Sequence, residues 1–317
     1  MPQLEQNLLD VLREHTAGDP MRPEVRWTNL SLKEMSRQLA QKGTPASKRV
    51  LRPLLKKLGF VKRKAHKTLA MGDHPDRDAQ FQNIAKIKQE FLDAGLPVLS
   101  IDTKKKELLG TFYRDGKLYS RDEVRVYDHD FPNFAKGKVV PYGIYDLAAN
   151  QAHVTIGTSH DTSEFAGECL ALWWEQHGRE RYPTATKLLL LCDGGGSNAS
   201  NRHVFKEELQ RLADRLGLEI RVAHYPPYCS KYNPIEHRVF PHVTRACQGV
   251  VFESVEGVSD LISRTHTQTG LTVTTSILDR VFEIGRKVAA DFLKACPILR
   301  DSVLPKWNYR ALPTPSS

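Results

Sequence analysis

The feature that most constrains the fold is a short apolar run that ends in an acid. Residues 187–192 read Lys-Leu-Leu-Leu-Leu-Cys with no polar alternation, and Asp193 and three glycines follow at once. A strand of this kind is buried on both faces, which is typical of a parallel strand between two layers of helices. The run predicts an α/β fold with Asp193 at the carboxyl end of a central strand, where such sheets place their sites.

The segments around this run predict the order of the elements. We expect strands within residues 98–113, 139–147 and 154–158, with a hairpin turn at Asp115-Gly116. A capping signature at 161–164 opens a helix, and the strand at 187–192, a helix at 201–216, a strand at 218–223 and a helix from about 234 follow. This order predicts a ribonuclease H-like fold, an α/β mixed sheet with flanking helices.

Three acids fall at positions that this fold would bring together. Asp102 ends the first strand, Asp193 ends the apolar strand and Glu236 begins the last helix. Three carboxylates can hold two Mg²⁺ ions, or Mn²⁺ in their place, about 3.5–4 Å apart. Such a pair serves phosphodiester cleavage and joining, and we expect Asp102 to bridge the ions. Taken singly, each acid could be an ordinary turn or helix-start residue.

Cationic residues adjoin two of the acids. Lys104, Lys105 and Lys106 follow Asp102, while His237 and Arg238 follow Glu236. We predict DNA contacts for Lys104, Lys105, His237 and Arg238, although each could equally be a solvated surface charge. A zinc site is the alternative for the nearby histidines and cysteines, but their spacings fit no short zinc pattern. These are His224, Cys229, His237, His242 and Cys247.

Positive charge is concentrated near the amino end. Residues 42–67 hold seven Lys, three Arg and no acid, whereas the whole chain carries +9. A capping box at Ser31 opens one predicted helix, and Thr44-Pro45 opens a second that ends at Gly59. The pattern predicts an all-α, helix-turn-helix-like module whose second helix enters the DNA major groove. Its candidate DNA contacts are Lys48, Arg49, Arg52, Lys56, Lys57, Lys62, Arg63 and Lys64.

Pro53 modifies this prediction. A proline inside a helix removes one hydrogen bond and clashes with the preceding turn, so the second helix should kink or begin late. The alternative to a helix-turn-helix is a solvated basic hairpin without a groove preference.

We divide the chain into four parts. Residues 1–75 form the basic module, 76–96 a connector helix, 97–275 the catalytic domain, and 276–317 a helix over 277–295 followed by a proline-rich tail. No apolar run approaches the roughly 20 residues of a membrane helix, the first residues lack a secretory layout, and the five cysteines form no C-x-x-C pair. We therefore expect a cytoplasmic protein, nucleoid-associated when acting, with no membrane partner.

Five strings of the sequence closely resemble the Rhodopirellula-type DDE transposases of bacterial insertion sequences. They are Ser-Ile-Asp-Thr-Lys-Lys-Lys-Glu-Leu at 100–108, Asp-His-Asp-Phe-Pro at 128–132, Pro-Tyr-Gly-Ile-Tyr-Asp-Leu at 141–147, Asp-Gly-Gly-Gly-Ser-Asn at 193–198 and Tyr-Asn-Pro-Ile-Glu-His-Arg at 232–238. The resemblance covers roughly residues 20–275. The segment 233–236 is also similar to the third-acid motif of mariner-like transposases.

The resemblance implies metal-dependent DNA strand cleavage and strand transfer at the ends of an insertion sequence. The catalytic and metal-binding acids carry over onto Asp102, Asp193 and Glu236. The expected partner is double-stranded DNA, at the element ends and the target, with a homo-oligomer assembled on it. Two alternatives stay open: an inactive or truncated transposase that acts as a DNA-binding repressor, and another ribonuclease H-like nuclease that cuts hybrids or junctions without joining ends.

Overall fold

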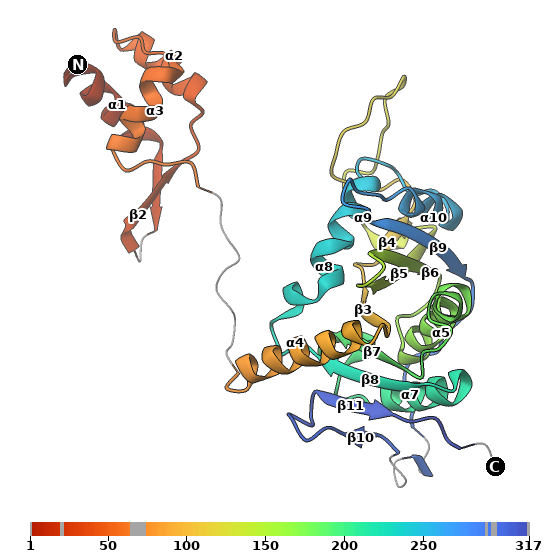
Figure 1. The fold of residues 1–317 in the computed structure, drawn as a ribbon. Helices are drawn as coiled ribbons and strands as arrows, with labels where there is room; N and C mark the ends of the chain where they lie inside the picture. The colour runs from red at the N-terminus through yellow and green to blue at the C-terminus, as the bar shows by residue number, and fades with distance from the viewer. Residues whose placement is uncertain (1, 20–21, 64–73, 289–290, 293–296, 316–317) are drawn as a thin grey trace. The chain divides into compact units, whose positions relative to one another are not determined.

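The computed structural model describes residues 2–19, 22–63, 74–288, 291–292 and 297–315. The chain divides into two compact units, Met1–Leu69 and Ala70–Ser317 (Figure 1). The predicted connector helix and the carboxyl-terminal segment both belong to the second unit. Each unit has its own hydrophobic core.

The described residues of the first unit form three helices and a hairpin. Helix α1 (Pro2–His15) precedes strands β1 (Thr16–Asp19) and β2 (Arg22–Thr28), and helices α2 (Leu32–Gln41) and α3 (Lys48–Lys57) follow. The predicted helix pair is confirmed, whereas the antiparallel hairpin was not expected, because its sequence has no clear two-residue alternation. The core of the first unit comprises Leu8, Val11, Leu12, Met35, Leu39, Leu51 and Leu55.

The ends of α2 and α3 show how the turn between them is fixed. The Ser31 hydroxyl accepts a hydrogen bond from the Glu34 N–H, so the predicted cap of α2 is confirmed. The predicted cap of α3 at Thr44 is wrong, because Ser47 takes that position. The Thr44 hydroxyl instead accepts from Asn7 Nδ2 at 3.0 Å, which ties the turn to α1. Helix α3 begins late, as expected, and runs through the exposed Pro53.

The second unit is built on a nine-stranded mixed sheet in the order β10-β11-β8-β7-β3-β5-β6-β9, with β4 paired to β5. Strands β3, β7 and β8 are mutually parallel, β5 runs antiparallel to β3 and β6, and β9 lies parallel to β6. The predicted ribonuclease H-like α/β arrangement is confirmed. The strand bounds are β3 Val98–Thr103, β4 Glu107–Leu109, β5 Gly137–Asp146, β6 Gln151–Gly157, β7 Lys187–Cys192, β8 Glu219–His224, β9 Thr272–Leu278, β10 Leu299–Arg300 and β11 Asn308–Ala311.

Helices cover both faces of the sheet (Figure 1). Helices α5 (Ser163–Trp173) and α7 (His203–Leu216) pack on the face that carries Leu99 and Ile101. The other face is covered by α4 (Arg77–Asp93), α8 (Pro234–Arg238), α9 (Phe240–Ala246) and α10 (Val255–Ser263). Shorter turns are η1 (Pro132–Phe134), the π-helix η2 (Trp174–Gly178), α6 (Arg179–Arg181), η3 (Gly196–Asn198) and η4 (Ser230–Tyr232).

The predicted hairpin turn at Asp115-Gly116 is wrong. Strand β4 ends at Leu109, and residues 110–136 form a long connection to β5. The turn packs instead on the segment after α9: the Gly249 N–H donates to the Asp115 carbonyl at 3.1 Å. A Cβ on Gly116 would lie 2.0 Å from Gln248 Cγ. The glycine therefore serves this close approach rather than a two-residue loop between strands.

The predicted helix over 277–295 is wrong for residues 277–288. Ile277 and Leu278 end strand β9, whose β-branched residues favour a strand, and no helix forms over 279–288, whereas the described residues 291–292 are helical. Further along, β11 pairs with β8 in register Tyr309↔Val222. The carboxyl-terminal segment therefore extends the sheet and is not a separate tail.

Candidate active site

The pairing of β3 with β7 places the first two acids side by side. The parallel ladder matches Ser100 with Leu191, so Asp102 and Asp193, each two residues further on, stand level and on the same face. Neighbouring strands lie about 4.8 Å apart. Two carboxylates therefore meet at the carboxyl edge of the sheet.

The third acid reaches the same edge because α8 is bonded to β3. The Ile235 N–H donates to Ser100 Oγ at 2.9 Å, and Asn233 Nδ2 donates to the Ile101 carbonyl at 3.0 Å. The Ser100 hydroxyl donates to Asn233 Oδ1 at 2.5 Å. All these atoms are buried. These bonds fix the helix that carries Glu236 to Ser100 and Ile101, the two residues that precede Asp102.

A glycine allows α8 and α9 to lie close to the sheet. Gly143 stands opposite Asp102 in the β3–β5 ladder. A Cβ at this position would lie 2.6 Å from Ile235 Cδ1 and 2.8 Å from Phe240 Cε1, closer than real contacts allow. A glycine inside a strand often marks such a close approach. Here it keeps room for the turn that delivers Glu236.

The acids influence one another electrostatically. The pKa of Asp102 is raised to about 8, first by burial and then by the nearby carboxylates of Asp193 and Glu236, although a hydrogen bond from the Thr103 N–H opposes the shift. Burial also raises the pKa of Asp193, although the Gly195 N–H donates to its Oδ1 at 3.1 Å and opposes the shift. A divalent cation beside such carboxylates would favour their ionised forms, because its charge opposes both the burial and the mutual repulsion.

Asp193 is held from behind by a buried imidazole. His224 Nδ1 donates to the Asp193 carbonyl at 2.9 Å, and the Tyr309 hydroxyl donates to His224 Nε2 at 2.8 Å. Burial lowers the pKa of His224 to about 4, so the ring is neutral and can donate from Nδ1 while it accepts at Nε2. Strand β11 therefore supports the second acid through one side chain.

The donor set suits hard divalent cations, because all three side chains offer carboxylate oxygens. Among the described residues, however, no three His, Cys, Asp or Glu side chains surround one common point as ligands.

The cations predicted beside the acids differ in their surroundings. Lys104 is half-buried and its Nζ lies 2.8 Å from Glu107, whereas Lys105 is exposed. His237 and Arg238 are exposed and line a pocket of about 350 Å³. No carboxylate lines this pocket, whose other lining residues are Tyr145, Leu147, Asn150, His242, Thr267, Thr269 and Leu271.

The cations predicted in the first unit lie mainly on one exposed helix and the segment after it. Lys57 is 2.7 Å from Glu5, so its charge is partly neutralised. Lys64 lies outside the described residues. The remaining six, all exposed, are Lys48, Arg49, Arg52, Lys56, Lys62 and Arg63.

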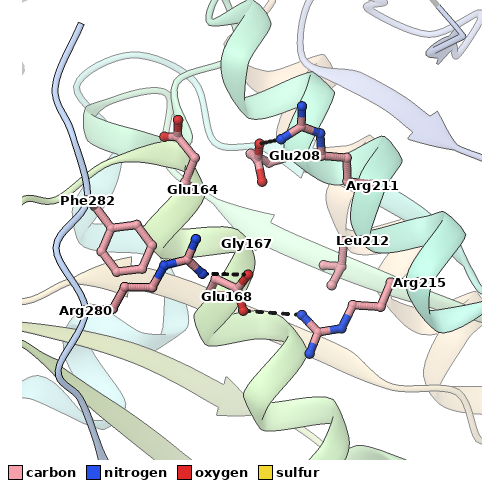
Figure 2. A pocket seen from close by; sticks show the side chains of 9 residues that line it. All are labelled: Glu164, Gly167, Glu168, Glu208, Arg211, Leu212, Arg215, Arg280 and Phe282. Carbon is pink, nitrogen blue, oxygen red and sulfur yellow. Dashed lines mark hydrogen bonds and ion pairs between the residues drawn. The ribbon is translucent and has the colours of Figure 1, made fainter. Parts of the chain in front are cut away.

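A second pocket, of about 180 Å³, lies between α5 and α7 and contains none of the predicted site residues (Figure 2). Its charges are paired: Arg215 binds Glu168 and Glu175, Arg211 binds Glu208, and Arg280 binds Glu168. The pairing fits a structural role in joining the two helices.

Sequence reasoning assigned no role to several residues that build the site. Gly143 in a strand and Asn233 before a proline carry a recognisable local signal, because both residue types mark special backbone positions. Ser100 and Tyr309 carry none, since their partners are distant in sequence, and the sequence offered His224 only as a ligand of the alternative zinc site.

A comparison with protein families shows to which family the chain belongs. The model of the family described as "Rhodopirellula transposase DDE domain" matches residues 7–313, nearly the whole sequence. The chain belongs to this transposase family. The resemblance inferred from the five sequence strings is therefore confirmed, and it extends further toward both ends than they indicated.

Comparison with solved structures finds Mos1 transposase complexes. The paired-end complex with the left transposon end is 13% identical, with a TM-score of 0.46 over 81% of this chain and 68% of that chain. The pre-cleavage Mos1 transpososome is 14% identical, with a TM-score of 0.46 over 81% and 69%. The mariner paired-end complex with Mn has 13% identity and a TM-score of 0.43 over 81% and 69%.

No curated protein matches this member of the transposase family. Across the described residues, no helix combines the length and the apolar character that a membrane crossing needs.

Proposed function

We propose that this transposase-family chain cleaves DNA strands at the ends of an insertion sequence and transfers them to a target, with Asp102, Asp193 and Glu236 as the catalytic and metal-binding acids. The observation that carries the proposal is the β3–β7 register, which sets Asp102 level with Asp193 at the edge where α8 carries Glu236. The raised pKa of Asp102 supports it, because the other two acids contribute to the shift.

The side chains divide the work as follows. Two Mg²⁺ ions, or Mn²⁺, would activate the attacking hydroxyl and stabilise the leaving oxygen of a phosphodiester. Asp102, from the central strand, would contribute to both ions, with Asp193 and Glu236 each holding one. The buried Ser100–Asn233 pair keeps α8 in place, and His224 separately holds the backbone of Asp193. The exposed His237 and Arg238 would contact phosphates of the bound strand.

Strand cleavage tests the proposal most directly. The substrate is a plasmid that carries the gene with its own flanking DNA, incubated with protein and Mg²⁺ or Mn²⁺. We expect nicking by the parent protein, loss of at least about 100-fold with Asp193→Ala, and parental activity with the exposed Asp260→Ala. Circular dichroism checks that both variants fold. If Asp193→Ala cuts as fast as the parent, the assigned site is wrong.

DNA binding by α3 is tested separately by its dependence on salt. Each phosphate contact contributes about 0.9 to the slope of log K against log salt concentration. Replacing Lys48, Arg49, Arg52 and Lys56 together by Ala should reduce the slope by up to about 4 and weaken binding at all sequences. An unchanged slope would remove α3 from the DNA interface. Binding by the parent chain without cleavage in either metal would instead favour a repressor.

A further inference from the structure

The loop between β8 and α8, residues 225–233, runs from the second acid to the third. At its start, the Tyr225 N–H donates to the Cys192 carbonyl at 2.8 Å, directly before Asp193. At its end, the buried Asn233 is bonded to β3 beside Asp102. Both ends of the loop are thus fixed at the site, and the residues between them form part of its rim.

This loop contains a strained tyrosine. The Cys229 N–H donates to the Pro226 carbonyl at 3.2 Å, which closes a four-residue turn with Pro227 second and Tyr228 third. Tyr228 has a φ of 61°. A proline followed by a positive φ is the pattern of a type II turn, whose third residue is normally Gly or Asn. A tyrosine here is unfavourable for the backbone, and strain of this kind is concentrated at functional sites.

Packing does not compensate for the strain. Tyr228 is 62% exposed, whereas Tyr225, three residues before it, and Cys229, the next residue, are 5% and 4% exposed. The other exposed tyrosine of the loop differs, because Tyr232 packs edge-on against Phe81 with ring centroids 5.1 Å apart. Among the described residues, no aromatic ring packs in this way on Tyr228.

We propose that the Tyr228 ring stacks on a nucleobase of the DNA strand next to the phosphate bound at the acids. The inference rests on the function proposed above. A strand whose phosphate lies at Asp102 and Asp193 carries its flanking bases past the rim, where a rigid turn holds the ring outward. Every base offers a flat face for stacking, so the contact sets the position of the strand without reading its sequence. The exposed Lys231, three residues further along the loop, suits the adjoining backbone.

Base stacking is measured without catalysis. Duplexes of the DNA bounding the gene carry 2-aminopurine at successive positions beside the cleavage point, and the protein carries Asp193→Ala so that it binds but does not cut. We expect a fluorescence change at one position, lost with Tyr228→Gly and retained with Tyr228→Phe. Affinity should fall roughly 5- to 150-fold with Tyr228→Gly and less than about twofold with Tyr228→Phe.

Thermal unfolding separates this role from a structural one. Glycine relieves the strained φ, so Tyr228→Gly should unfold at the parental temperature or higher while it binds DNA more weakly. Parental affinity and an unchanged 2-aminopurine signal in Tyr228→Gly would overturn the inference. A Tyr228→Gly protein with a changed oligomeric state but no fluorescence change would also overturn it. A parent protein that shows the signal but never cuts would refute the proposed function and leave the stacking intact.

Discussion

Ser100 and Asn233, 133 residues apart in the chain, share a buried hydrogen bond of 2.5 Å between Ser100 Oγ and Asn233 Oδ1. The same hydroxyl accepts from the Ile235 N–H, and the Asn233 amide donates to the Ile101 carbonyl. These three bonds attach the first turn of α8 to the strand that carries Asp102. The distance between the first and third acids therefore depends on two side chains that take no part in the chemistry.

Removing the Asn233 side chain should separate Glu236 from Asp102. We expect Asn233→Ala to reduce DNA nicking by at least about 10-fold at limiting Mg²⁺ and less at high Mg²⁺, because a displaced ligand weakens metal affinity. The loss of buried hydrogen bonds should also cost about 1–3 kcal/mol of stability. Metal titrations of nicking measure this, with the exposed Asn201→Ala as control. Equal loss at every Mg²⁺ concentration would contradict a positioning role.

Gly143→Ala tests the close approach of α8 and α9 to the sheet. The added Cβ meets Ile235 and Phe240 at 2.6–2.8 Å and must displace them, with an expected cost of about 1–3 kcal/mol and a large loss of nicking. Gly137→Ala on the same strand is the matched control, since its Cβ meets only Leu109 Cδ1 at 3.5 Å, an ordinary contact. Chemical unfolding and nicking are compared for both. Similar behaviour of the two variants would exclude a special role for Gly143.

Asp102 should make the metal-free protein less stable at high pH. Its folded pKa, about 8, lies above the ordinary aspartate pKa of 3.8, so the folded state binds more protons between these values and stability falls as pH rises toward 8. Asp102→Asn removes this loss. At pH 8 in EDTA the variant should therefore unfold at least about 2–4 °C above the parent.

Mg²⁺ should reverse the order of the two unfolding temperatures, because it stabilises the parent and not Asp102→Asn. Differential scanning fluorimetry with and without Mg²⁺ gives both comparisons. A parent protein that gains nothing from Mg²⁺ or Mn²⁺ would argue against these acids as metal ligands.

His153 should make the protein sensitive to acid. Burial, followed by the neighbouring His177, lowers the pKa of His153 from 6.5 to about 4. The unfolded chain therefore binds more protons between these values, and the stability present above pH 6.5 is lost as pH falls toward 4. Between pH 7 and pH 5, the free energy of unfolding should fall by about 2 kcal/mol less in His153→Phe than in the parent. Urea unfolding at the two pH values measures this, and identical losses in both proteins would contradict it.

The sequence by itself determined most strands and helices of the central sheet and its layers, and it singled out the three acids as candidates. The apolar run at 188–192 predicted a strand buried on both faces, because it has no polar residue to present to water. Capping residues such as Ser31 and Thr162 marked helix starts, because a side-chain oxygen satisfies N–H groups a few residues away. These interactions are local, so their pattern is visible along the chain.

Tertiary structure alone decided which distant groups meet. The register that sets Asp102 level with Asp193 depends on how two strands slide past each other. The addition of β11 to the sheet depends on pairing across more than 80 residues, and the attachment of α8 to β3 depends on Ser100 and Asn233. Backbone pairing and buried hydrogen bonds between remote residues leave no periodic trace in a sequence, because each partner is chosen by the packing of the whole domain.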